Sequence, residues 1–120
     1  MAETERGGPT ISTHVLDTET GQPAAGVHVS LYKLGEDERP IRLTQALTDA
    51  DGRVRDLLER PLSPGTYRLE FRLVGRANPA ENGGPFFPRL SVDLRIDDTS
   101  RSYHVPLLLA SYSMTTYRGS

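Results

Sequence analysis

The 120-residue chain contains no cysteine and no tryptophan, and only three phenylalanines. Without cysteine it can form neither a disulfide nor a thiolate metal site, and it has no cysteine nucleophile. The scarcity of aromatic residues predicts a core built mainly from Leu, Val and Ile, with some of the five Tyr. The length is that of one domain with a single core.

A strong charge and a long apolar run are also missing. The formal net charge is -2, with basic and acidic residues interspersed, so the sequence favours neither a nucleic acid nor a membrane surface as partner. No stretch is long and apolar enough for a signal-peptide core or a membrane span. We expect a flexible polar arm at 1–10, one domain at 11–120 and a cytoplasmic location.

What the sequence does contain is repeated alternation of apolar and polar residues, which is typical of half-buried strands. We predict strands at 11–18, 27–34, 41–48, 66–74 and 89–96. Turn-forming residues recur about every ten positions, which predicts an all-β antiparallel sandwich of seven or eight short strands with at most one short helix. A short helical or irregular turn is expected at 54–62, and a surface loop at 75–85.

The segment 103–117 predicts two further strands, joined near Ala110 and Ser111. Pro106 lies inside the first of them and has no N–H to donate to a neighbouring strand. We therefore expect an edge position or a local break there.

The three histidines are the first candidates for chemistry. By alternation, His14 and His104 project from the face of their strands that is turned away from the core, whereas His28 stands in no motif. Their isolation does not favour a three-histidine metal site. The sequence contains no Gly-x-Ser-x-Gly elbow and no phosphate-binding loop. The residues 49–52 are typical of a plain turn in which Gly52 takes the left-handed conformation.

Five motifs, all in the expected order, carry a resemblance to a known family. They are Ile-Ser-Thr-His-Val-Leu-Asp at 11–17, Gly-Gln-Pro-Ala at 21–24, Asp-Gly-Arg at 51–53, Tyr-His-Val-Pro-Leu-Leu-Leu at 103–109 and Tyr-Arg-Gly-Ser at 117–120. Together they closely resemble the 5-hydroxyisourate hydrolases, the transthyretin-related enzymes of urate breakdown. The last motif is the most specific, because it separates these hydrolases from the hormone-carrying transthyretins.

The resemblance implies a transthyretin-like sandwich whose strands pair across a dimer, with two dimers stacked around a central channel as a homotetramer. It implies that water opens the cyclic amide of 5-hydroxyisourate in purine catabolism, giving 2-oxo-4-hydroxy-4-carboxy-5-ureidoimidazoline, without metal or organic cofactor. Carried over by position, the residues implied in catalysis and substrate binding at the subunit interface are His14, Arg53, His104 and Ser120, with Tyr117 and Arg118 in substrate binding.

These side chains suit amide hydrolysis, which needs a base for the attacking water and a donor for the developing oxyanion. Histidine can act as the base near neutral pH. The planar fork of Arg53 matches a ring that carries adjacent carbonyl groups. The sequence leaves open whether His14 or His104 is the base.

Two departures from the family pattern stand out. Met114 replaces an aromatic residue on the last strand, and the segment 76–84 is short and poor in helix formers where relatives carry a surface helix. Either could change the pocket or the subunit interface. Two other functions stay open: a transthyretin-type carrier of small ligands without catalysis, and a structural or carbohydrate-associated sandwich, which predicts a monomer.

Overall fold

The computed structural model describes residues 8–73 and 84–119. Within these ranges the chain forms nine strands and no helix. The strands are β1 (Ile11–Asp17), β2 (Gln22–Pro23), β3 (His28–Leu34), β4 (Pro40–Leu47), β5 (Arg53–Val54), β6 (Gly65–Arg72), β7 (Arg89–Ile96), β8 (Tyr103–Leu109) and β9 (Met114–Thr116). β2 and β5 are only two residues long, which is why this number exceeds the predicted seven or eight.

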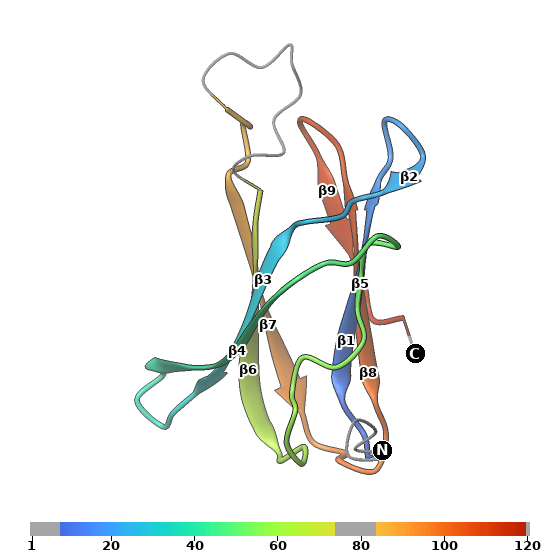
Figure 1. The fold of residues 1–120 in the computed structure, drawn as a ribbon. Helices are drawn as coiled ribbons and strands as arrows, with labels where there is room; N and C mark the ends of the chain where they lie inside the picture. The colour runs from blue at the N-terminus through green and yellow to red at the C-terminus, as the bar shows by residue number, and fades with distance from the viewer. Residues whose placement is uncertain (1–7, 74–83, 120) are drawn as a thin grey trace.

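The strands form two sheets that face each other as the layers of a sandwich (Figure 1). One sheet has the order β2-β1-β8-β9, with β5 also pairing with β1, and the other has the order β4-β3-β6-β7. The predicted all-β sandwich is thus confirmed. Among the described pairs, β1 with β8 is parallel and the others are antiparallel. The parallel β1–β8 pair departs from the predicted antiparallel arrangement. These two strands are far apart in the sequence, so no hairpin forces them to run antiparallel.

The core lies between the sheets and follows the predicted alternation. Ile11, Thr13 and Val15 of β1 point inward and are buried, whereas the residues between them are half-buried. β6 buries Tyr67 and Phe71, and the Tyr67 hydroxyl donates to the carbonyl of Ser63 at 2.7 Å. Each fully buried apolar side chain of this size contributes roughly 1.5–3 kcal/mol. The predicted core of Leu, Val and Ile with a few Tyr is confirmed.

The prediction that Pro106 marks an edge strand or a break is wrong, because β8 is continuous and lies between β1 and β9. The Pro106 carbonyl accepts from the Thr116 hydroxyl at 2.7 Å, so this residue faces the β9 side. The last residue pair between β8 and β9 is Leu107 with Thr116. Pro106 therefore lies just beyond the end of β9, where no ladder bond requires its missing N–H.

The connection after β5 is irregular and contains no helix up to residue 62. Its Leu57 N–H donates to the carbonyl of Ile11 at 2.8 Å, and both Leu57 and Leu58 are buried. Most of the arm predicted at 1–10 and of the loop predicted at 75–85 lies outside the described residues, so both stay predictions. Thr10 is described, and its carbonyl accepts from the Tyr103 N–H at 2.8 Å.

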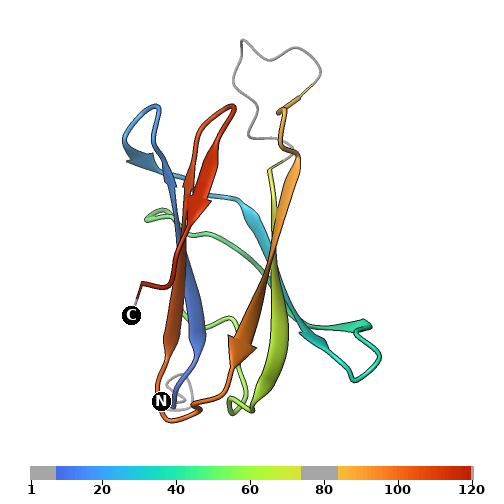
Figure 2. The ribbon, with the colours of Figure 1, turned by 180° about the vertical axis from the view of Figure 1, so that it is seen from behind.

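After β9 the chain turns onto the outer face of the first sheet, the face directed away from the second sheet. Opposite views place the described segment after β9, which ends at residue 119, on this side (Figure 1 and Figure 2). The candidate site lies on the same outer face.

Candidate active site

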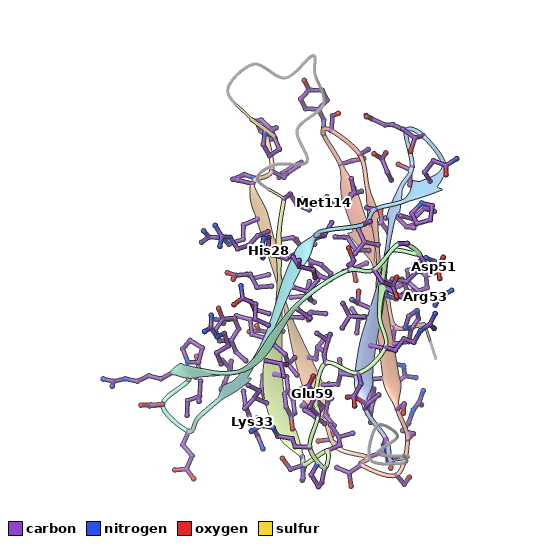
Figure 3. The ribbon with its side chains drawn as sticks, in the orientation of Figure 1. His28, Lys33, Asp51, Arg53, Glu59 and Met114 are labelled. Carbon is purple, nitrogen blue, oxygen red and sulfur yellow. The ribbon has the colours of Figure 1, made fainter. Side chains whose placement is uncertain are left out.

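Strand register brings four polar side chains to the outer face of the first sheet. His14 of β1 is the register partner of Arg53 of β5, and Ser12 of β1 is the partner of His104 of β8. Partners on neighbouring strands point to the same side of a sheet, and the residues between them on β1 face the core. Figure 3 shows Arg53 on the side away from the second sheet. The structure thus gathers three of the predicted catalytic residues, together with Ser12, on one surface.

A tight turn delivers Arg53 to this surface. Gly52 has φ +77°, the predicted left-handed conformation, and its carbonyl accepts from the Val15 N–H at 2.7 Å. A Cβ atom at this position would lie 2.4 Å from the Val15 carbonyl oxygen. Only glycine therefore lets the turn approach β1 so closely.

The Asp49 carboxylate stabilises the same turn by accepting hydrogen bonds from its backbone. Its Oδ1 accepts from the N–H groups of Asp51 at 2.9 Å and Arg53 at 3.0 Å. The hydrogen bond from the Arg53 N–H is the main reason why the pKa of Asp49 is lowered. Sequence reasoning identified the turn but not this role of Asp49 in fixing the backbone of Arg53.

A cavity of about 210 Å³ opens beside these residues. Its lining consists of Ser12, Thr13, Arg53, Val54, Arg55 and His104. Two guanidinium groups and an imidazole suit a small planar ligand with several carbonyl oxygens or an anionic charge. Arg55, which was not predicted, follows Arg53 at the strand period of two and so lines the same cavity.

His104 is half-buried, and its Nδ1 lies 2.9 Å from the hydroxyl of Ser12. Burial lowers the pKa of His104, and the positive charges of Arg53 and His14 lower it further. Both causes disfavour the imidazolium form. His104 is therefore a neutral imidazole near pH 7, as a general base must be.

The segment after β9 is fastened against His104. The Gly119 N–H donates to the His104 carbonyl at 2.6 Å, and a Cβ atom at 119 would lie 2.8 Å from Cδ2 of the ring. Ser120, the fourth predicted catalytic residue, lies outside the described residues. Gly119 of the Tyr-Arg-Gly-Ser motif therefore contacts His104, which lines the cavity, and sequence reasoning missed this contact.

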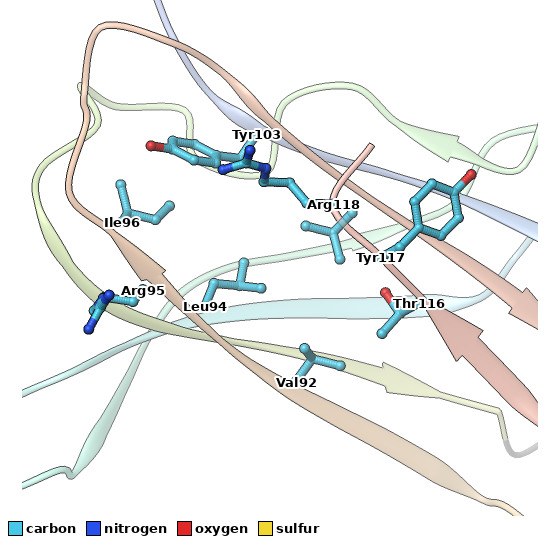
Figure 4. A pocket seen from close by; sticks show the side chains of 9 residues that line it. Val92, Leu94, Arg95, Ile96, Tyr103, Thr116, Tyr117 and Arg118 are labelled. Atoms are coloured by element: carbon cyan, nitrogen blue, oxygen red, sulfur yellow. The ribbon is translucent and has the colours of Figure 1, made fainter. Parts of the chain in front are cut away.

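Tyr117 and Arg118 do not line this cavity within one chain. They line a second cavity, of about 330 Å³, between β7 on one side and β8, Thr116 of β9, Tyr117 and Arg118 on the other. Figure 4 shows Arg118 beside Tyr103, with Val92, Leu94 and Ile96 of β7 on the facing wall. The predicted substrate-binding role of Tyr117 and Arg118 therefore stays a prediction.

Met114 packs against the hydrophobic core. It does not line the cavity that contains Arg53 and His104. The Met114 side chain therefore does not form part of the wall of the described cavity, and its effect on the pocket or the subunit interface stays a prediction.

His28 belongs to β3 in the second sheet and is exposed. Figure 3 places it on the opposite outer side of the sandwich from Arg53, so the three histidines do not converge. In the described part of the chain, no three His, Cys, Asp or Glu side chains are grouped in a way that could hold a metal ion. Likewise, residues 8–73 and 84–119 include no helix long and apolar enough to cross a membrane.

Comparison with known proteins gives the same family for nearly the whole chain. The HIUase/Transthyretin family model matches residues 11–119. A 5-hydroxyisourate hydrolase of Deinococcus radiodurans is 42% identical over 123 residues, which cover 95% of this chain and 98% of that protein. A 5-hydroxyisourate hydrolase of Salmonella typhimurium is 41% identical over 115 residues, covering 95% of this chain and 83% of that protein.

Solved structures show the same architecture. The 5-hydroxyisourate hydrolase of Klebsiella pneumoniae superimposes with a TM-score of 0.77 at 37% identity, over 93% of this chain and 99% of that one. Transthyretin from Sparus aurata superimposes with a TM-score of 0.78 at 25% identity, over 90% and 94% of the two chains. With a family match along almost its full length, the chain belongs to the HIUase/transthyretin family.

Proposed function

We propose that this protein is a 5-hydroxyisourate hydrolase of urate degradation. Proteins with this name are 41% and 42% identical to it over nearly the full chain. The observation that carries the proposal is that Arg53 and the neutral His104 line one cavity, with His14 on the same outer face. Binding and proton transfer can therefore take place at one site.

The proposed reaction is the addition of water to a ring carbonyl, followed by cleavage of the ring C–N bond. A histidine of the pair His14 and His104 removes a proton from the water as its oxygen bonds to the carbonyl carbon. Arg53 holds the ring oxygens and stabilises the negative charge that develops on the carbonyl oxygen. The ring nitrogen then receives the proton, and 2-oxo-4-hydroxy-4-carboxy-5-ureidoimidazoline leaves as product.

An absorbance assay on 5-hydroxyisourate freshly made from urate tests this proposal. The wild type should accelerate its decay over the spontaneous rate. His104→Asn should lower kcat/KM by about 10²–10⁴-fold, the usual contribution of a positioned base, and Arg53→Gln by about 10²–10³-fold.

The matched control is Arg42→Gln, which removes an arginine from β4 in the second sheet and should keep wild-type activity. A well-folded wild type that does not accelerate the decay would refute the proposal. Tight binding of an aromatic ligand by that inactive protein would favour the carrier function instead.

The proposal includes assembly as a homotetramer, a dimer of dimers with sites at subunit interfaces. β7 and β9 each stand at the end of their sheet and pair with one strand in the described chain, so each leaves an edge to which a second copy can add. Tyr117 is 53% exposed beside that edge. Four chains of 13.2 kDa give about 53 kDa, which light scattering should measure; a 13.2 kDa particle would contradict the assembly.

The roles of Tyr117, Arg118 and Ser120 in substrate binding are part of the same proposal. Ser120→Ala tests the terminal residue directly, because it keeps the length of the chain and removes one hydroxyl. We expect a lower kcat/KM with an unchanged molar mass. The cytoplasmic location stays a prediction that cell fractionation would test.

A further inference from the structure

Ser12 and His104 stand opposite each other across the parallel β1–β8 pair, and the Ser12 hydroxyl lies 2.9 Å from Nδ1 of His104. We propose that Ser12 is a positioning residue, which holds the His104 ring with its proton on Nδ1 and the lone pair of Nε2 turned to the cavity. The effect of Ser12 on kcat rests on the proposed hydrolase activity. The position of the proton on the His104 ring can be measured without substrate.

Two contacts fix the orientation of the ring. Ser12 holds the Nδ1 edge, and Gly119 lies against Cδ2, where a Cβ atom would come within 2.8 Å. Rotation about χ2 would exchange Nδ1 with Cδ2 and so break the hydrogen bond to Ser12. With Nδ1 engaged, Nε2 is the ring nitrogen left for the ligand.

The charges around the cavity favour one position of the proton on the neutral ring, and the Ser12 hydrogen bond adds to the preference for the same form. Arg53 and Arg55 line the cavity together with His104. An unprotonated Nε2 directs its lone pair, the negative end of the ring dipole, toward these cations, whereas an Nε2–H group would direct a positive end toward them. The Ser12 hydroxyl can accept a hydrogen bond as readily as donate one. It therefore accepts from Nδ1–H.

The question of tautomer matters because His104 is neutral near pH 7, as its lowered pKa requires. Only an unprotonated Nε2 can take a proton from the attacking water. The water oxygen then bonds to the ring carbonyl carbon, Nε2 holds the proton, and the same proton passes to the ring nitrogen when the C–N bond breaks. Ser12 thereby prepares His104 to act as the base.

Nitrogen-15 NMR of the histidine side chains in the intact protein at neutral pH tests the assignment. The wild type should give His104 a protonated Nδ1 and an unprotonated Nε2, with Ser12→Thr unchanged, because threonine keeps the hydroxyl. Ser12→Ala should move the population toward the Nε2–H form. A wild type with the proton on Nε2, or a Ser12→Ala spectrum identical to wild type, would overturn the proposal.

The kinetic measurement separates positioning from general destabilisation. Ser12→Ala should lower kcat by about 10–100-fold, as loss of a hydrogen bond to a functional histidine does elsewhere, with KM changed less than about 2-fold, and Ser12→Thr should restore most of kcat. A Ser12→Ala enzyme with wild-type kcat would contradict the role. If the wild type has no hydrolase activity, the proposed function fails, and the NMR result still decides the tautomer.

The matched control is Ser102→Ala. Ser102 also links the β1 and β8 segments, because its hydroxyl accepts from the Thr10 N–H at 3.0 Å, whereas the His104 ring pairs with Ser12. Ser102→Ala should leave both the His104 tautomer and kcat at wild-type values. Equal losses of kcat in the two variants would assign the effect to strand pairing and refute the specific role of Ser12.

Discussion

Gly119 contacts both the backbone and the imidazole ring of His104. The Gly119 N–H donates to the His104 carbonyl at 2.6 Å, and the Cα of Gly119 is so close to the imidazole that an added Cβ would lie 2.8 Å from Cδ2. Gly119 therefore forms one side of the space that the His104 ring occupies, and we expect a substitution at either residue to displace the other.

Gly119→Ala should move the His104 ring or detach the end of the chain, because a methyl group cannot fit between them. We expect kcat/KM to fall about 10-fold or more, in line with the large cost of a misplaced catalytic group, while the melting temperature changes little. The measurement is the decay assay together with a thermal melt. Gly35→Ala, in the loop between β3 and β4, is the control, and equal activity in both variants would exclude the steric role of Gly119.

Gly52→Ala should destabilise the protein strongly, both because of the positive φ and because the added Cβ would clash with β1. Comparison with Gly21→Ala separates these two effects. Gly52 and Gly21 both have positive φ, +77° and +74°, but a Cβ at 52 would lie 2.4 Å from the Val15 carbonyl, whereas a Cβ at 21 meets no atom within 4 Å. Gly21→Ala should cost about 1 kcal/mol of unfolding free energy from backbone conformation alone. Gly52→Ala should cost at least about 2 kcal/mol more.

Urea unfolding of these two alanine variants measures the difference. Gly52→Ala should also lower kcat/KM, because Arg53 follows directly in the chain. Similar unfolding free energies for the two variants would show that the turn can move away from β1 without loss.

The pKa of His104 should lie below the usual value of about 6.5, because burial and the charges of Arg53 and His14 oppose protonation. In Arg53→Gln it should rise but stay below that value, since burial persists. A folded-state pKa below the unfolded one means that the unfolded chain binds the proton more readily. The free energy of unfolding should therefore fall as the pH drops from about 6.5 through the folded pKa.

A side-chain NMR titration measures the pKa of His104 in the wild type and in Arg53→Gln. Arg42→Gln is the control, in which the titration midpoint should equal that of the wild type. The acid limb of kcat/KM should share the same low midpoint if His104 is the base. A midpoint at or above about 6.5 in the wild type would contradict the electrostatic account.

Asp49→Asn should weaken the turn that carries Arg53 in a pH-dependent way. The pKa of Asp49 is lowered, chiefly by the hydrogen bond from the Arg53 N–H. Its ionised form therefore stabilises the fold above the unfolded pKa of about 3.9, and this contribution is lost as the pH falls through the lower folded pKa. Wild type should be more stable than Asp49→Asn at pH 6, and the difference should shrink at pH 3. A difference that does not change with pH would exclude the role of the charge.

Much of the fold was predictable because strand alternation is a local property. The alternation of β1 and β6 identified their buried faces, and the Asp-Gly pair before Arg53 identified the left-handed turn at Gly52. The prediction for β8 was wrong at Pro106, because a proline disrupts a strand only where a neighbouring strand needs its N–H. Whether it does so here depends on where β9 ends. That position is a property of the packed sheet and has no signal within the segment itself.

The site was predictable only in part, for the same reason. Alternation placed His14 and His104 off the core, and the family motifs added Arg53. Ser12 was visible on the face of His14, but nothing local connected it with a histidine 92 positions away. Arg55 and Gly119 likewise gain their meaning only from the cavity and the ring that they contact.

The sequence by itself determined the all-β class, the faces of the strands and the residues able to do acid–base and anion-binding chemistry, because these depend on residue type and a period of two. The tertiary structure decided the parallel register of β1 and β8. A shift of one residue would set His104 opposite Thr13, whose side chain faces the core, and so separate it from Ser12. Packing of the whole inner face fixes that register, and with it the position of the His104 ring.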